Sequence, residues 1–326
     1  NQKRRMSRYL RTITSSCTCA LLLASILSAT AQLSPPESPL IFMENIVSTN
    51  LNERDMAISP DGSEMFFTIQ ANQHAVSTII RLKKLSNNKW SDPEVATFSG
   101  KYSDLEPAFS PDGKKLYFSS NRPVTGNDPK DYDIWYVEKI NEMWTAPRSL
   151  GAPVNTSSNE FYPSVTSNGN IYFTAEYENG VGKEDIYLSR WVNGTFTTPM
   201  PLDTAVNSKL WEFNAFVTAD ERYIIFTSYG RKNEKGGGDL YISTKNNEGK
   251  WTPARLLNKI NSNVLDYCPF VTADQKSFFF TSARHDLASH EKTKTFADLS
   301  KTYNGITNGS ENIYWMSFAS LLESLK

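Results

Sequence analysis

The sequence is poor in the residues that most often build metal centres and covalent cross-links. Its 326 residues include three cysteines and three histidines. Cys17 and Cys19 lie in an N-terminal apolar segment that we predict is removed, so the mature chain keeps Cys268 and no internal disulfide is expected. His285 and His290 are five residues apart, which is no recognised zinc spacing. We therefore predict neither a metal nor a cofactor.

An excess of charge of one sign is also lacking. The 34 Lys and Arg residues nearly balance the 35 Asp and Glu residues, so the formal net charge is −1. Because nucleic-acid-binding proteins usually carry a basic excess, we expect no nucleic-acid partner. The sequence has no Gly-x-Ser-x-Gly motif for a nucleophilic serine. Its one glycine run, GGGD from Gly236 to Asp239, precedes a predicted strand rather than a helix, which argues against a phosphate loop.

Long apolar runs are absent except near the N-terminus. The segment from Cys17 to Ala29 (CTCALLLASILSA) follows a basic head and precedes the small-residue pattern Ala29-Thr30-Ala31. This order predicts a signal peptide over residues 1–31 and a mature start at Gln32. The run is too short for an ordinary spanning helix, so a retained membrane anchor is the less favoured alternative. An exported chain without disulfides fits a bacterial periplasmic or secreted protein.

What the sequence does have is a repeated phrase built on a tight turn. It reads ISPDGSEMFFTI, FSPDGKKLYFSS, VTSNGNIYFTAE, VTADERYIIFTS and VTADQKSFFFTS, with turn residues Asp61, Asp112, Asn168, Asp220 and Asp274. The spacing of 51 to 56 residues indicates a repeat architecture. Each copy predicts four strands and no helix, and four-stranded units repeated around an axis make a β-propeller. We predict an all-β fold in which residues 32–326 form one five-bladed propeller.

The two ends of the chain predict how the ring closes. The fifth copy ends without a fourth segment of its own, and Pro36 to Asn45 (PESPLIFMEN) resembles the fourth segments of other copies. The N-terminal strand should therefore complete the last blade and leave no open sheet edge. The same blade carries an insertion, residues 283–311, of a length that is commonly functional or disordered.

The units FSPDGKKLYFSSNR and YDIWYVEK resemble the WD-type repeats of TolB-like β-propellers of exported bacterial proteins. The resemblance extends over about residues 38–318. It implies the propeller fold rather than one activity, because such repeats occur in scaffolds, binding modules and accessory domains of peptidases. The third copy departs from the pattern, with Ser167-Asn168-Gly169 in place of Pro-Asp-Gly.

One acidic position recurs in every copy, eight residues before the turn residue. Its members are Glu53, Asp104, Glu160, Glu212 and Asp266, and we call them the acidic column. Five carboxylates around the mouth of a central channel are suited to a cation, an amine-bearing ligand or a peptide N-terminus. The alternative is that each carboxylate accepts hydrogen bonds from backbone N–H groups and fixes its own loop. Repetition in all blades favours the second interpretation, since ligands rarely have fivefold symmetry.

Further candidate ligand-binding residues follow the second strands and flank the acidic column. Arg122, Arg231 and Arg284 follow the second strand in three copies. Each guanidinium is able to hold a ligand carboxylate or phosphate, or to pair with the Asp that opens the third strand, as in Arg122 with Asp133 and Arg231 with Asp239. Aromatic residues at the same loops are candidates for stacking on a ligand or for packing between blades: Phe161, Tyr162, Trp211, Phe213 and Tyr267.

These features favour a monomeric, exported, non-catalytic propeller that binds a protein, a peptide or a cell-envelope glycan. The alternative is a glycoside hydrolase or another extracytoplasmic hydrolase that uses carboxylates at the channel mouth. A glycosidase needs two carboxylates in unlike environments. An acid at every blade does not single out such a pair, so we predict no catalytic residue.

Overall fold

The repeated turn organises each blade in the same way. The structure is a computed structural model that describes residues 34–285, 287 and 295–326, so the predicted signal peptide and His290 lie outside the described residues. In the first copy, Ser59 Oγ donates to Asp61 Oδ1 at 2.6 Å and Ser63 N donates to the same oxygen at 3.0 Å. The other four turns repeat the hydroxyl contact to Asp112, Asn168, Asp220 and Asp274. The turn residues are therefore structural, as short polar side chains often are in tight turns.

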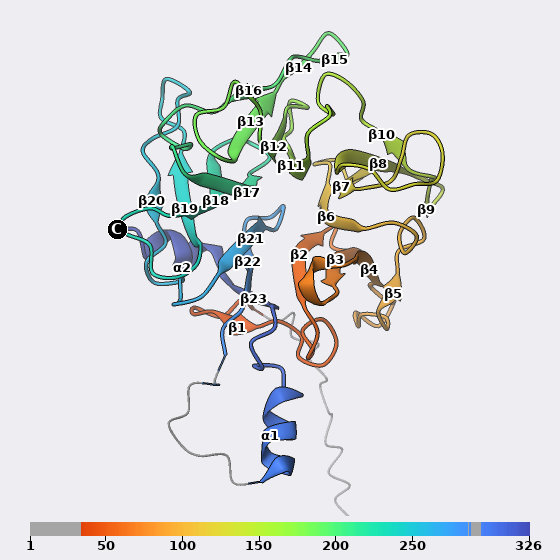
Figure 1. Ribbon diagram of the computed structural model, residues 1–326, viewed down its shortest axis with the longest axis vertical. Coiled ribbons are helices and arrows are strands. Elements are labelled where there is room, and N and C mark those ends of the chain that lie inside the picture. The colour runs from red at the N-terminus through yellow and green to blue at the C-terminus, as the bar shows by residue number, and fades with distance from the viewer. Residues whose placement is uncertain (1–33, 286, 288–294) are drawn as a thin grey trace, which may run out of the picture. The chain divides into compact units, whose positions relative to one another are not determined.

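Five antiparallel sheets surround a central channel as the blades of a propeller, as predicted (Figure 1). Blade 1 contains β2 (Glu53–Ile58), β3 (Glu64–Gln70), β4 (Ser77–Lys83) and β5 (Glu94–Val95). Blade 2 contains β6 (Asp104–Phe109), β7 (Lys115–Ser120), β8 (Asp133–Ile140), β9 (Met143–Trp144) and β10 (Arg148–Ser149). Blade 3 contains β11 (Glu160–Val165), β12 (Ile171–Ala175), β13 (Asp185–Ser189) and β16 (Met200–Pro201), with a hairpin of β14 (Trp191–Val192) and β15 (Thr195–Phe196).

The remaining two blades have the same order from the channel outward. Blade 4 contains β17 (Trp211–Val217), β18 (Tyr223–Tyr229), β19 (Asp239–Thr244) and β20 (Arg255–Leu256). Blade 5 contains β21 (Asp266–Val271), β22 (Ser277–Ser282), β23 (Asn312–Ser317) and β1 (Leu40–Ile41). A short 3-10 helix (Asn72–His74) and two α-helices, α1 (Phe296–Tyr303) and α2 (Phe318–Glu323), complete the described elements. None of the described helices is long and apolar enough to cross a lipid bilayer.

The N-terminal strand completes the last blade, which confirms the predicted closure. β1 pairs antiparallel with β23, with Leu40 opposite Trp315 and Ile41 opposite Tyr314. Just beyond it, the hydroxyl of Ser48 donates to Ile313 O at 3.2 Å and accepts from Ile313 N at 3.2 Å. The strands β1 and β23 thus meet in one sheet, and the edge of β23 that faces away from β22 is paired.

The insertion in the last blade contains a helix that the sequence analysis did not predict. The side chain of Thr295 accepts a hydrogen bond from Asp298 N and begins α1. A Thr followed three residues later by an acid is a typical start signal of a helix, so the sequence held this information. None of the eight residues of α1 is buried.

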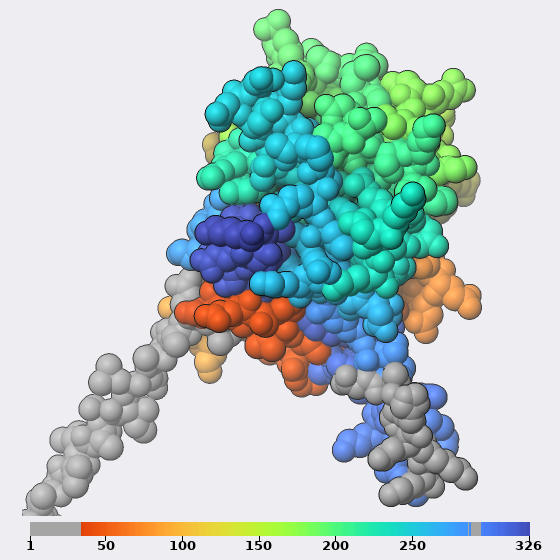
Figure 2. All heavy atoms as spheres, turned by 90° about the vertical axis from the view of Figure 1, so that its left-hand side faces the viewer, coloured from red at the N-terminus to blue at the C-terminus, as the bar shows by residue number. Residues whose placement is uncertain are grey.

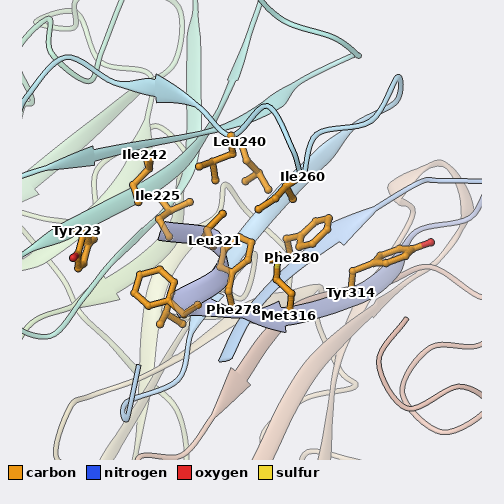
Figure 3. Packing of buried hydrophobic residues seen from close by; sticks show 13 residues of the cluster. Tyr223, Ile225, Leu240, Ile242, Ile260, Phe278, Phe280, Tyr314, Met316 and Leu321 are labelled. Carbon is orange, nitrogen blue, oxygen red and sulfur yellow. The ribbon is translucent and has the colours of Figure 1, made fainter. Parts of the chain in front are cut away.

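The C-terminal helix α2 covers the groove between blades 4 and 5. Its Phe318 lies edge-on against Tyr223 of blade 4, with ring centroids 5.5 Å apart, and Leu321 is fully buried in the same cluster (Figure 3). Figure 2 shows α2 in dark blue directly beside the orange N-terminal strand. The strand β1 and the helix α2 therefore pack on the same side of the ring.

Candidate functional site

The acidic column is buried, and its carboxylates bind their own loops. All five side chains have no exposed surface. Glu160 accepts hydrogen bonds from Thr156 N at 3.2 Å and from Thr156 Oγ1 at 2.7 Å. A Thr or Ser four residues earlier does the same for Glu53, Glu212 and Asp266. Asp104 accepts from Ser99 Oγ at 2.8 Å and from Ser120 Oγ at 2.6 Å. None of the five is presented to solvent in the channel.

The three arginines pair with the acidic column. Arg122 Nη2 lies 2.5 Å from Asp104 Oδ1, and Arg231 Nη2 lies 2.9 Å from Glu212 Oε1. Arg284 pairs with Asp266 in the same way, at 3.0 Å. The predicted pairing of these arginines with Asp133 and Asp239 is wrong. A guanidinium at the end of the second strand reaches back to the innermost strand, where a buried acid needs its charge.

A tyrosine takes the place of the arginine in blade 3. Tyr177 Oη donates to Glu160 Oε1 at 2.7 Å and to Val154 O at 3.0 Å, the two kinds of acceptor that Arg231 uses in blade 4. Within the described chain, neither Glu160 nor Glu53 has an arginine partner. Burial raises the pKa of Glu160 to about 7 and also raises the pKa of Glu53.

We expect alanine substitutions in the acidic column to destabilise the protein, and the loss should be larger where the acid has an arginine partner. Asp104→Ala leaves the buried guanidinium of Arg122 without its counter-charge, a loss of about 3–5 kcal/mol in the free energy of unfolding. Glu53→Ala leaves only the Thr49 N–H and hydroxyl unpaired, a loss of about 1–3 kcal/mol. Urea unfolding of the two variants measures both values. Equal losses would show that the ion pair adds nothing to loop anchoring.

The innermost strand of every blade bulges two residues after its acid. The bulge residues are Asp55, Glu106, Tyr162, Asn214 and Cys268, and all five have positive φ values between 48° and 62°. The ladder between the first and second strands shifts register at each of these points. Non-glycine residues seldom adopt this conformation, and bulges of this kind often redirect side chains near functional sites. The backbone is the same in all blades, whereas the side chains differ.

The bulge side chains and Arg54 form one buried network across the channel, which we call the central network. Arg54 lies 2.9 Å from Asp55 and 3.0 Å from Glu106, and its Nη2 lies 3.5 Å from Cys268 Sγ. Glu106 also accepts hydrogen bonds from Tyr162 N at 2.7 Å and from Asn214 Nδ2 at 3.1 Å. Contacts from blades 1, 3 and 4 therefore converge on one carboxylate of blade 2.

The central network lies between two cavities of the channel, and Glu106 lines both of them. The cavity on the turn side is about 90 Å³ and mostly apolar. The cavity on the opposite side is about 310 Å³, and we call it the channel-mouth cavity. Its lining includes Arg54, Gln70, His74, Leu105, Glu106, Tyr132, Phe161, Thr174, Glu184, Phe213, Asn214, Leu265 and Tyr267.

Three of the five predicted aromatic residues, Phe161, Phe213 and Tyr267, line the channel-mouth cavity. The Phe161 ring lies 5.0 Å from that of Tyr132, which the sequence analysis did not single out. Tyr162 lies within the central network, where its hydroxyl donates to Pro269 O at 3.0 Å. Trp211 is outside the lining, and its ring lies tilted against that of Tyr229, with centroids 5.5 Å apart. The prediction of aromatic residues near the loops therefore identified part of the cavity wall.

Glu184 is the acid of this cavity that has no ion pair or side-chain hydrogen bond within the described chain. It precedes the third strand of blade 3 and is partly buried. Burial, followed by repulsion from Glu106, Glu176 and Asp185, raises its pKa to about 7. Burial likewise raises the pKa of Glu106, against the opposing effect of Arg54. The cavity thus holds two acids whose ionised forms are unfavourable.

The comparisons with known proteins agree with the fold. No protein-family model matches the chain, and no curated protein matches it. TolB from Acinetobacter baumannii is 15% identical with a TM-score of 0.45, and the match covers 82% of this chain and 55% of TolB. An α-L-arabinofuranosidase from Lactobacillus brevis is 13% identical with a TM-score of 0.48, covering 84% of this chain and 92% of the enzyme.

Another similar structure, a glycoside hydrolase, has a TM-score of 0.51 at 8% identity, and the match covers 87% of this chain and 92% of the hydrolase. At such identities these likenesses concern the fold alone. They do not decide between a binding protein and an enzyme. The protein is a five-bladed β-propeller.

Proposed function

We propose that the protein is an exported, monomeric binding module whose channel-mouth cavity takes an amine-bearing ligand with an apolar body, such as a lysine side chain of a peptide. The observation that carries this proposal is the unpaired carboxylate of Glu184 in a cavity with aromatic walls. The pattern of residues 1–31 supports export.

The charges of the cavity support a cationic ligand. Arg54 is the lining residue with a permanent positive charge, and it already pairs with Asp55 and Glu106. When Glu106 is ionised, one guanidinium faces two carboxylates, which leaves a negative balance, and Glu184 adds to it when it ionises as well. An ammonium group beside Glu184 supplies the missing counter-charge, and a buried charge is tolerated chiefly when it is paired.

The walls support an apolar body behind the ammonium group. Rings of Tyr132, Phe161 and Phe213 and the side chains of Leu105 and Leu265 line the cavity. Aromatic faces attract cations and pack against the methylene groups of a lysine stem. A volume of about 310 Å³ is at the lower end of the range for small-ligand sites, which suits one side chain rather than a folded domain.

Hydrolysis of a glycan is the second candidate, and one observation favours it. Glu106 and Glu184 share the cavity and both have raised pKa values, as a general acid requires. Glu106, however, accepts from Arg54, Ser119, Tyr162 and Asn214, so its oxygens are already occupied. An acid held by four donors is poorly placed to exchange a proton with a substrate, and binding without catalysis is the better account.

Matched peptides test this proposal. We expect peptides that carry lysine to bind more tightly than the same peptides with norleucine, because only the ammonium group pairs with Glu184. Glu184→Gln keeps the size of the side chain and should remove this preference, a loss of about tenfold in affinity for one charge pair. The measurement is fluorescence anisotropy with a labelled library of short peptides at pH 8. Glu178→Gln, an exposed acid outside the cavity lining, is the control.

Two results would contradict the proposal. The first is equal binding of the lysine and norleucine peptides, or no binding by any member of the library. The second is release of sugar from nitrophenyl glycosides that is lost in Glu184→Gln, which would establish the hydrolase instead.

A further inference from the structure

On the turn side, a large aromatic side chain packs between neighbouring blades at four of the five blade junctions. Trp90 packs in the cluster between blades 5 and 1, and Trp144 packs on Phe66 between blades 1 and 2, with ring centroids 6.0 Å apart. Trp251 lies 6.4 Å from Tyr172 between blades 3 and 4. Helix α2 fills the groove between blades 4 and 5 with Phe318 and Leu321. Trp251, Phe318 and Leu321 are buried, and Trp90 and Trp144 pack partly buried against the core.

The groove between blades 2 and 3 is different. The smaller Phe196 stands at the position of these tryptophans, and a cavity of about 750 Å³ remains. We call it the inter-blade groove, and its lining is Ser110, Pro111, Asp112, Lys115, Tyr117, Tyr136, Ser149, Leu150, Val165, Thr166, Ser167, Gly169, Trp191 and Phe196. A smaller cavity of about 300 Å³ lies between the turns of blades 1 and 2, and no aromatic residue lines it. The inter-blade groove is therefore distinguished by its size and its aromatic walls.

Trp191 presents its ring at this groove in a fixed position. Its indole packs on Gly169 so closely that a Cβ atom there would come within 3.0 Å of the ring. On another side it contacts Phe196, with ring centroids 4.7 Å apart, and its backbone N–H donates to Asn170 Oδ1 at 3.0 Å. The side chain nevertheless stays 45% exposed. The Ser167-Asn168-Gly169 turn, which departs from the repeat, is the turn on which this tryptophan packs.

The polar groups of the groove favour an uncharged ligand with many hydroxyl groups. Lys115 Nζ lies 3.4 Å from Glu138 and 4.8 Å from the centre of the Tyr136 ring, so its charge is compensated. The hydroxyls of Tyr117 and Tyr136 have no hydrogen-bond partner within the described chain, and Asp112 uses Oδ1 alone for its turn. The groove thus offers both donors and acceptors beside aromatic rings. The charge in its lining that has no ion pair within the described chain is that of Asp112, whose Oδ2 is available to a ligand hydroxyl.

We propose that the inter-blade groove is a binding site for an uncharged saccharide, with one sugar ring stacked on Trp191. A sugar ring has apolar C–H faces for the aromatic walls and hydroxyl groups at its edge for Tyr117, Tyr136 and Asp112. A proline-rich peptide also fits aromatic grooves, but its prolines have no N–H to offer to an acceptor such as Asp112. This site is independent of the channel-mouth cavity, with which it shares no lining residue.

The experiment uses the mature protein and two substitutions with opposite effects on the groove. Trp191→Ala removes the stacking ring, and Phe196→Trp is designed to fill the groove as tryptophan does between other blades. The probes are neutral gluco-, manno-, xylo- and arabino-oligosaccharides of four to six units, measured by calorimetric titration. We expect at least one of them to bind the unaltered protein and both substitutions to weaken it about tenfold or more.

Three controls make the result decisive. Phe296→Ala removes an aromatic ring of α1 that is 83% exposed and should not change saccharide binding. Glu184→Gln should also leave saccharide binding unchanged, because Glu184 lines the channel-mouth cavity. The proposals for the two sites are thus tested independently. Melting curves report whether each variant is folded. If Trp191→Ala does not fold, the result with Phe196→Trp decides. The proposal is overturned if no saccharide of the panel binds, if binding survives both substitutions, or if a proline-rich decapeptide binds in their place.

Discussion

Deletion of residues 32–45 is expected to unfold the protein or to convert it into oligomers. The deletion removes β1, and with it the outer strand of blade 5 that pairs with β23. It also removes Phe42, whose ring lies 4.9 Å from Phe279 and 5.3 Å from Trp315 in the core between blades 5 and 1. The exposed edge of β23 then pairs with other chains, as unprotected edge strands do. Size-exclusion chromatography and far-UV circular dichroism measure the outcome.

Two point substitutions separate the contribution of strand pairing to stability from the contribution of the side chains. Phe42→Ala should cost about 3–5 kcal/mol in the free energy of unfolding, because it leaves a cavity in a packed core. Leu40→Ala, in the same strand but 56% exposed, should cost less than about 0.5 kcal/mol. A truncated protein that stays monomeric and melts at the wild-type temperature would show that the ring does not depend on this closure.

Arg54→Met is expected to be the most damaging single substitution in the channel. Arg54 is buried and forms ion pairs with Asp55 and Glu106. Its removal leaves two carboxylates buried beside each other without a positive charge, which costs about 3–5 kcal/mol. The matched control is Arg148→Met, which breaks an exposed ion pair with Glu138 and should cost less than about 0.5 kcal/mol. Chemical denaturation of both variants provides the comparison.

The damage from Arg54→Met should also depend on pH in a defined direction. Burial raises the pKa of Glu106 above its value in the unfolded chain, so the folded state holds this proton more tightly. Its contribution to stability is therefore full in acid and is lost as the pH rises through the folded-state pKa. Without Arg54 this pKa rises further, so the difference between variant and wild type should be smaller at pH 5 than at pH 8. A difference that does not change with pH would mean that Glu106 is not ionised beside Arg54.

The sequence predicted the scaffold well because the scaffold is repeated. Turn residues such as Asp61 and the aromatic strands after them recur at a regular spacing, and each copy carries the same local information. The closure was also predictable, since a missing segment at one end matched a surplus segment at the other. The outer strands follow a short hairpin after the third strand. In blade 2, Trp144 lies in this hairpin as part of β9, and the outer strand β10 follows Pro147.

The candidate site was harder to predict because its residues are the ones that do not repeat. The acidic column drew attention by its regularity, yet regularity is what a loop-anchoring role produces. The useful signal was two residues further on, where Glu106 and Asn214 place polar groups in the middle of apolar strands. Their position on left-handed bulges that face the channel depends on backbone geometry, which no local sequence pattern revealed. No sequence pattern singled out Glu184, because its place in the cavity depends on where the loop before the third strand of blade 3 lies.

The most direct test of the proposed binding function is the affinity for a lysine-containing peptide at two pH values. Glu184 has a pKa of about 7, so it is mostly protonated at pH 6 and mostly ionised at pH 8, whereas a lysine amine stays charged at both. Calorimetric titration should therefore show binding about tenfold tighter at pH 8 than at pH 6 in the wild type. The difference should be much smaller in Glu184→Gln, where Glu106 is the remaining acid with a raised pKa in the cavity. Equal affinity at both pH values in the wild type, or an unchanged pH dependence in the variant, would contradict the proposal that Glu184 receives the ligand's charge.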